Sequence, residues 1–196
     1  MPDRDASAAT QAILELLAGH QPADRAEAES LAQIRSLVAD SPDPWSRHQY
    51  EPGHLTASAV VIDPERRRIL LVFHEKLLRW VQPGGHFEPG EWEPTAAAAR
   101  EALEETGMET RGPEPGDAAK PPLLDVDVHF IPARQDEPEH RHFDLRFLLV
   151  AEPGRLHARE GTADYLWAAP SDLAVLNLDP NLRRALAKIW DIVGSA

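Results

Sequence analysis

The chain has 196 residues, no cysteine, and 20 basic against 33 acidic side chains, which gives a formal net charge of −13. A chain of this length suits one domain with an appendage, and the missing cysteines exclude disulfides, thiolate metal sites and cysteine nucleophiles. The negative charge would repel a nucleic-acid backbone over most of the surface, so a nucleic-acid polymer is not an expected partner. A small phosphorylated substrate can still bind where metal ions and local cations offset the field.

Targeting features are missing from the chain. Its first residues lack the positive end and apolar run of a signal peptide, and no later stretch approaches the roughly 20 apolar residues of a membrane span. Together with the absence of cysteine, this favours a cytoplasmic protein without a membrane partner.

Two amphipathic helices are predicted near the N-terminus, over residues 6–18 and 23–39, with a break at residues 19–22. Their apolar stripes consist of Ile13, Leu14, Leu16 and Leu17, and of Leu31, Ile34, Leu37 and Val38. We expect these helices to pack on the main domain, although they could instead cover its mouth or form a homodimer contact. The turn-rich segment 41–45 then separates an N-terminal helical extension, residues 1–45, from a domain of residues 46–196.

The later chain predicts strands and a last helix. Residues 54–62 and 69–73 predict a hairpin, residues 112–122 a loop, and residues 143–150 and 164–168 two further strands. Residues 123–131 alternate, with apolar Leu124, Val126, Val128 and Phe130 on one side and Asp125, Asp127 and His129 on the other. A helix should begin at Asp179-Pro180 and bury Leu182, Leu186, Ile189, Trp190 and Val193.

The segment 94–106 predicts a short helix, because Pro94 suits a first turn and Gly107 can supply a left-handed stop. On that helix Glu101, Glu104 and Glu105 fall within an arc of about 100°. Ala96, Ala99 and Leu103 lie opposite, which predicts one carboxylate face and one core face. A divalent cation such as Mg²⁺, which takes oxygen ligands, would relieve the repulsion among the acids; a solvated acidic surface is the alternative.

Residues 85–108 resemble the Nudix box, whose pattern is G-x5-E-x7-R-E-U-x-E-E-x-G-U with U an apolar residue. The matching positions are Gly85, Glu91, Arg100, Glu101, Ala102, Glu104, Glu105, Gly107 and Met108. Eight residues instead of seven separate Glu91 from Arg100, so either Glu91 or Glu93 could serve as the upstream glutamate. We favour Glu91, because its interval from Gly85 is kept and the extra residue can be absorbed at Trp92-Glu93.

The resemblance implies an α/β fold, a Nudix-like α/β/α sandwich with a mixed sheet, here preceded by the N-terminal helical extension. It also implies that Mg²⁺ or Mn²⁺ is held by the carbonyl of Gly84 and by Glu101, Glu104 and Glu105. One of these glutamates, or a loop acid, would be the general base. Gly85, Glu91, Arg100 and Gly107 would support the site structurally.

The activity that the resemblance implies is metal-dependent hydrolysis of a phosphoanhydride bond in a nucleoside diphosphate linked to another group. Two alternatives are a nucleoside triphosphate pyrophosphohydrolase and a non-catalytic nucleotide-sensing module. The sensing module would be marked by loss of box carboxylates, and all three are present. The segments that distinguish the sub-families are missing, so the substrate-binding residues are unassigned.

Four histidines, His86, His129, His140 and His142, lie in or near predicted site loops. No pair has the HExxH arrangement of a zinc site, and we expect a hydrogen bond to substrate or a surface role for them. Glu139 and Asp164 are weaker candidates for an additional metal ligand, since acids of this kind are usually exposed.

Overall fold

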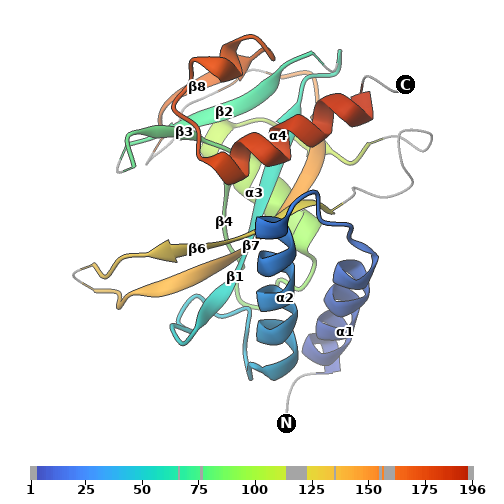
Figure 1. Ribbon diagram of the computed structural model, residues 1–196, viewed down its shortest axis with the longest axis vertical. Coiled ribbons are helices and arrows are strands. Elements are labelled where there is room, and N and C mark those ends of the chain that lie inside the picture. The colour runs from blue at the N-terminus through green and yellow to red at the C-terminus, as the bar shows by residue number, and fades with distance from the viewer. Residues whose placement is uncertain are drawn as a thin grey trace.

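A mixed sheet runs through the centre of the protein, with helices on both of its faces (Figure 1). The computed structural model describes residues 4–65, 67–75, 77–113, 123–134, 136–154, 156 and 162–193, without the side chains of residues 4–5, 162–163 and 190–193. The prediction of a loop at residues 112–122 therefore falls almost entirely outside the described residues, as do the predictions for the side chains of Trp190 and Val193.

The helices begin and end within two residues of the predicted positions. They are α1 (Arg4–Gly19), α2 (Arg25–Asp40), α3 (Pro94–Thr106) and α4 (Pro180–Val193), with one 3₁₀ turn at Asp172–Ala174. Local capping explains the bounds of α2 and α3. The side chain of Asp24 accepts a hydrogen bond from Glu27 N, and Gly107 closes α3 in a left-handed conformation with φ of 69°. Within the described chain, no helix has the length and apolar character needed to cross a membrane.

The strands are β1 (Gly53–Ile62), β2 (Ile69–His74), β3 (Arg79–Val81), β4 (Gly84–His86), β5 (Thr110–Arg111), β6 (Leu123–Ile131), β7 (His140–Ala151) and β8 (Thr162–Ala168). β1 and β7 form the parallel centre, in register from Gly53 opposite Arg141 to Ile62 opposite Val150. The other contacts are antiparallel: β2 and β4 pair with β1, β6 and β5 with β7, and β3 and β8 with β2. The predicted hairpin of β1 and β2 is confirmed.

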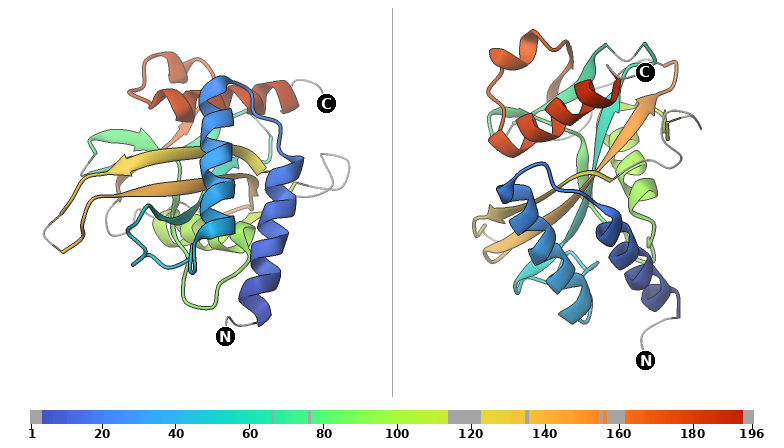
Figure 2. Two further views of the ribbon diagram at one scale, coloured as in Figure 1. Left: turned by 60° about the horizontal axis from the view of Figure 1, so that its bottom comes forward. Right: turned by 45° about the vertical axis from the view of Figure 1, so that its right-hand side comes forward.

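The helices form layers on either side of this sheet, which confirms the predicted α/β sandwich. Figure 2 shows α3 against one face and α4 against the other, with α1 and α2 packed together beside them. Alternate residues of the central strands divide between two cores. Leu55, Ala57, Ala59 and Val61 of β1 face α3 and the N-terminal helices, whereas Val60 and Ile62 lie under α4.

The N-terminal helices pack on the domain, as predicted. Ile13, Leu17 and Ile34 are at most 1% exposed and share one core with the sheet. Glu27 of α2 is fully buried, accepts a hydrogen bond from His20 and forms an ion pair with Lys188 of α4. Burial alone would raise the pKa of Glu27, but these partners hold it well below its ordinary value. The boundary at residue 45 and a homodimer contact stay predictions.

The polar residues of the alternating strand β6 are mostly buried. Asp125 and Asp127 are 0% and 3% exposed, whereas Phe130 on the apolar side is 59% exposed. The reason is a set of ion pairs with distant residues. Arg146 of β7 contacts both aspartates at 3.0–3.1 Å, and Arg184 of α4 contacts Asp125 at 2.8 Å. These guanidinium groups compensate the charge of the buried acids. A sequence pattern within one strand cannot reveal such distant partners.

Candidate functional site

The carboxylates of α3 lie on the side of the helix that packs against the sheet. Its buried residues are Pro94, Ala97, Ala98, Ala102 and Thr106. At about 100° per residue, Glu101 and Glu105 project within this buried arc, and Glu104 projects at its edge. Ala96 is exposed and Leu103 is 40% exposed, so the predicted separation of a carboxylate face from a core face is wrong. Small alanine side chains around the acids allow the helix to approach the sheet closely enough for the carboxylates to reach it.

Strand β4 receives these carboxylates at its glycine pair. Gly84 N donates a hydrogen bond to Glu105 Oε2 at 3.2 Å. A Cβ on Gly85 would lie 2.7 Å from the carboxylate of Glu101, and one on Gly84 would lie 2.3 Å from Ser58 Oγ of the neighbouring strand. Both positions therefore need glycine for close approach, and neither requires it for a left-handed φ.

Arg100 ties α3 to the preceding segment through Glu91. Its Nε and Nη2 donate to the Glu91 carboxylate at 3.2 and 2.9 Å, and Nη2 also donates to the carbonyl of His86 at 2.8 Å. The remaining nitrogen, Nη1, donates to Glu101 at 3.0 Å and to Glu104 at 3.1 Å. Hydrogen bonding to Glu91 above all raises the pKa of Arg100, which is therefore always charged.

The extra residue between Glu91 and Arg100 is accommodated at the start of α3. Glu93 is the N-cap of α3. Its side chain accepts a hydrogen bond from Ala96 N at 2.6 Å and is therefore turned toward the first turn of the helix. Glu91 instead closes the turn that contains Gly90, by accepting from Glu88 N at 3.0 Å. Glu91, and not Glu93, is thus the glutamate that contacts Arg100.

The three box carboxylates differ in their surroundings. Glu104 is 53% exposed, whereas Glu101 is 14% exposed and its pKa is raised, chiefly by burial. Burial and then the charge of Glu101 raise the pKa of Glu105 to about 7. Arg100 contacts Glu101 and Glu104, and no ion pair reaches Glu105 among the described residues. The set thus has a surplus of negative charge around hard oxygen donors, which suits a divalent cation such as Mg²⁺.

Polar residues also line the sheet behind the glycine pair. Asp144 of β7 accepts hydrogen bonds from Thr56 and Ser58 of β1 at 2.8–3.0 Å, and from Arg146 Nε at 3.1 Å. Gln82 donates to the same carboxylate at 3.4 Å. This group was not predicted from the sequence. Its signal was the alternation of His142, Asp144 and Arg146 with apolar residues in β7, which marks a strand face that is polar over half its length.

The four predicted histidines converge, together with His54, on the same face of the sheet. They lie on strands and not on loops: His54 on β1, His86 on β4, His129 on β6, and His140 and His142 on β7. His142 Nε2 is 3.2 Å from His140 Nε2 and 3.3 Å from His86 Nε2. Burial lowers the pKa of His86 to about 3 and also lowers the pKa values of His54 and His142, so these rings are neutral at neutral pH.

Two other predicted candidates lie apart from these groups. Glu139 and Asp164 are both exposed, and no hydrogen bond joins either of them to a box carboxylate in the described part of the chain. Asp164 lies on β8, which pairs with β2 and not with β4.

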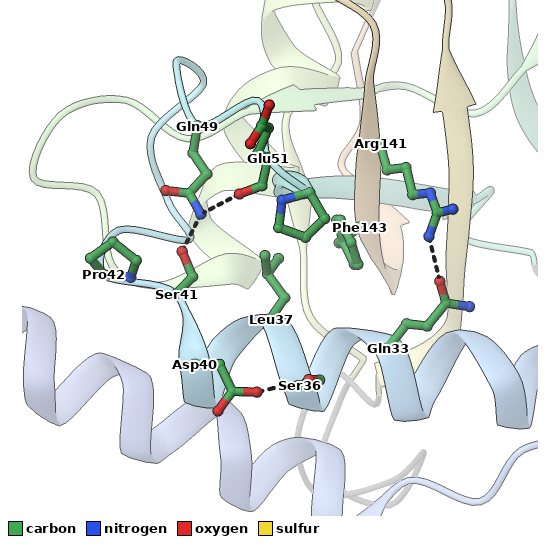
Figure 3. A pocket seen from close by; sticks show the side chains of 11 residues that line it. Gln33, Ser36, Leu37, Asp40, Ser41, Pro42, Gln49, Glu51, Arg141 and Phe143 are labelled. Atoms are coloured by element: carbon green, nitrogen blue, oxygen red, sulfur yellow. Dashed lines mark hydrogen bonds between the residues drawn. The ribbon is translucent and has the colours of Figure 1, made fainter.

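A cavity of about 370 Å³ opens between α2 and residues 49–52 (Figure 3). Leu37, Pro52 and Phe143 line it together with polar residues, among which Gln33 and Arg141 are joined by a hydrogen bond of 3.1 Å. It includes none of the box residues. The box carboxylates, and not this cavity, are therefore the candidate site.

Comparisons with known proteins agree on the fold. A family model for the NUDIX domain matches residues 52–189. A solved NUDIX-family hydrolase from Clostridium perfringens superposes with a TM-score of 0.53 at 20% identity, over 74% of this chain and 97% of that one. The NUDIX domain of Shewanella oneidensis NrtR, solved in complex with ADP-ribose, superposes with a TM-score of 0.50 at 14% identity, over 82% and 98% of the two chains. No curated protein sequence matches this chain.

Proposed function

Because the chain belongs to the Nudix family, we propose that it is a metal-dependent hydrolase that cleaves a phosphoanhydride bond in a nucleoside diphosphate linked to another group. One observation carries the proposal. Helix α3 holds Glu101 and Glu105 mostly buried against the glycine pair of β4, where the chain supplies Arg100 to one carboxylate and no ion pair to the other among the described residues. Such a surplus of buried negative charge is costly unless a cation compensates it.

In this proposal Glu101, Glu104, Glu105 and the carbonyl of Gly84 hold Mg²⁺ or Mn²⁺, the ions that suit an all-oxygen donor set. When bound, such an ion neutralises and orients a diphosphate and lowers the pKa of an attacking water.

The chain's own contribution is to orient the carboxylates. Arg100 sets the positions of Glu101 and Glu104 through Nη1, while Glu91 and the carbonyl of His86 hold the guanidinium in place. Gly84 N fixes one oxygen of Glu105. One of the three glutamates, or an acid on a loop, would accept the proton of the attacking water.

The substrate class follows from the family and from chemistry. ADP-ribose, the ligand in the NrtR complex, is one nucleoside diphosphate linked to another group and belongs in a first substrate panel. A nucleoside triphosphate is the alternative substrate. A non-catalytic sensing module is a third reading, but it would have no need to keep all three carboxylates.

The test is product release from a panel of nucleotide derivatives, including ADP-ribose and nucleoside triphosphates, with Mg²⁺ and with EDTA. Glu104→Gln and Glu105→Gln should each lose most turnover, on the order of 10²-fold, because positioning errors alone can have that effect. Glu109→Gln, on an exposed acid just beyond the box, is the matched control and should keep wild-type turnover. Near wild-type rates for Glu104→Gln or Glu105→Gln at saturating Mg²⁺ would exclude that residue as a ligand. Tight binding without turnover by the wild type would favour the sensing module.

A further inference from the structure

Two rings of the histidine cluster have fixed tautomers. His54 Nδ1 lies 3.0 Å from the carbonyl of Gln49, and His140 Nδ1 lies 2.8 Å from the carbonyl of Pro138. A carbonyl only accepts hydrogen bonds, so in both rings Nδ1 carries the proton and Nε2 of the neutral ring carries a lone pair. Histidines that bind metal are held in this manner, with one nitrogen donating to a carbonyl while the other coordinates.

The histidine cluster has more Nε2 lone pairs than hydrogen-bond donors to satisfy them. His54 is 1% exposed, and its Nε2 is buried with no hydrogen-bond partner in the described structure. A proton on His142 Nε2 can serve His140 or His86, but it cannot serve both. The cluster therefore keeps at least one buried acceptor without a partner, an arrangement that folded proteins rarely tolerate.

The spacing of the rings suits a transition-metal ion. One ring nitrogen from each of His54, His140 and His142 lies within 4.8 Å of the other two. The two measured Nε2–Nε2 separations, which join His142 to His140 and to His86, are 3.2 and 3.3 Å. Four nitrogens at Zn–N distances of about 2.0–2.1 Å form a tetrahedron with edges of roughly 3.3–3.4 Å.

We propose that His54, His140 and His142 bind one transition-metal ion of the zinc class through their Nε2 atoms, with His86, which contacts His142 but lies outside this group of three, as the fourth ligand. Imidazole nitrogens select Zn²⁺ and its neighbours over Mg²⁺, so this site is chemically distinct from the box carboxylates. The fifth ring, that of His129, is not a ligand. It is 41% exposed, so we leave it out of the ligand set.

The proposed ion would join three strands, because its ligands come from β1, β4 and β7. A site with four protein ligands is closed and has a structural role. It would also hold β4 next to the box, since His86 follows the glycine pair directly and its carbonyl accepts from Arg100. The inference rests on the histidine geometry and does not depend on the proposed hydrolase activity.

The experiment is a titration of the chelator-treated full chain with Zn²⁺, and separately with Co²⁺, in the presence of excess Mg²⁺. Isothermal calorimetry and elemental analysis give the stoichiometry, and visible d–d absorption reports tetrahedral nitrogen ligands around Co²⁺. We expect one equivalent of tightly bound ion and a higher melting temperature. His140→Gln and His142→Gln should weaken binding by more than about 100-fold, beyond the usual effect of losing an outer-shell partner.

Two matched variants locate the ion. His129→Gln removes a neighbouring ring that is not a ligand and should leave the affinity unchanged. The variant Glu101→Gln/Glu104→Gln/Glu105→Gln should still bind one equivalent of Zn²⁺, which separates this site from the box. Circular dichroism checks that each variant is folded. If the histidine variants do not fold, the wild-type titration and the box variant still test the proposal. No binding by the wild type, equal affinity in His129→Gln and His140→Gln, or loss of Zn²⁺ in the box variant would each overturn the proposal.

Discussion

Glu91→Gln tests the contact that ties α3 to the segment before it. The substitution keeps the shape of the side chain and removes the charge that faces Arg100 at 2.9 Å. The guanidinium would keep its contacts with Glu101, Glu104 and the carbonyl of His86. We therefore expect a loss of stability that is smaller than the full value of a buried pair.

The magnitude follows from the exposure of the two partners, which is 22% for Arg100 and 18% for Glu91. Breaking a fully buried pair costs about 3–5 kcal/mol, and exposed pairs contribute about 0–1 kcal/mol. With two other carboxylates still on the guanidinium, we expect Glu91→Gln to lower the free energy of unfolding by about 1–2 kcal/mol. Glu93→Gln should lower it by only about 0.5 kcal/mol, because the glutamine oxygen can still accept from Ala96 N.

The effect of Glu91→Gln should also depend on pH. Burial alone would raise the pKa of Glu91, but Arg100 and the backbone of Glu88 bring it below its ordinary value of 4.5. As the pH falls through 4.5 the unfolded chain binds the proton first, so the contribution of the pair is present above that pH and is lost below it. The difference between wild type and Glu91→Gln should shrink accordingly.

The assay is urea-induced unfolding of wild type, Glu91→Gln and Glu93→Gln in EDTA at pH 7, repeated at pH values down to about 4. Turnover measured in parallel should fall more for Glu91→Gln, since Arg100 also orients Glu101 and Glu104. A loss of stability in Glu93→Gln that equals or exceeds the loss in Glu91→Gln would refute this reasoning.

Three further predictions concern the carboxylates and the glycine pair. In thermal melting, Mg²⁺ or Mn²⁺ should stabilise the wild type more than Na⁺ does at matched ionic strength, by about 2.7 kcal/mol at a hundredfold excess over Kd. Neither ion should stabilise the variant Glu101→Gln/Glu104→Gln/Glu105→Gln. Equal shifts in the wild type and the variant would mean that the acids are only a solvated surface. In EDTA, the pKa of Glu105 is raised in the folded state to about 7, against 4.5 in the unfolded chain. Protonated Glu105 therefore stabilises the folded state at low pH, and this contribution is lost as the pH rises through 7. The wild type should then lose up to about 3 kcal/mol relative to Glu105→Gln between pH 5 and 8 in urea unfolding, and parallel curves would contradict the assignment. Gly85→Ala places a Cβ 2.7 Å from the Glu101 carboxylate and should reduce turnover about 10²-fold, whereas Gly19→Ala, with no atom within 4 Å of the new Cβ, should not; equal rates would show that the close approach is unimportant.

Local patterns in the sequence determined the helices, most of the longer strands and the residues of the box. Pro94 and Gly107 bound α3 in the structure as they do in the sequence, and the apolar stripes of α1 and α2 are the faces that pack. The pairing of Arg100 with Glu91 was also within reach of the sequence, because both residues belong to one motif and lie nine positions apart. These features depend on caps and on side-chain spacing within an element, which act over a few residues.

Only the tertiary structure decided which face of α3 is buried. Residues 96–99 are four consecutive alanines, so their hydrophobicity is the same all round the helix and does not select a face. The selection comes from the sheet, where Gly84 N donates a hydrogen bond to Glu105 and the missing Cβ of Gly85 leaves room for the Glu101 carboxylate.

The buried charges and the histidine cluster were likewise decided by contacts between distant segments. Asp125 is buried because Arg184, 59 positions away, reaches it, and His86 meets His142 across 56 positions. The sequence of either segment alone does not show which distant residue it contacts. A charge or an imidazole is buried at low cost only when such a partner is present. The free energy of burying these side chains is therefore a property of the assembled sheet and helices.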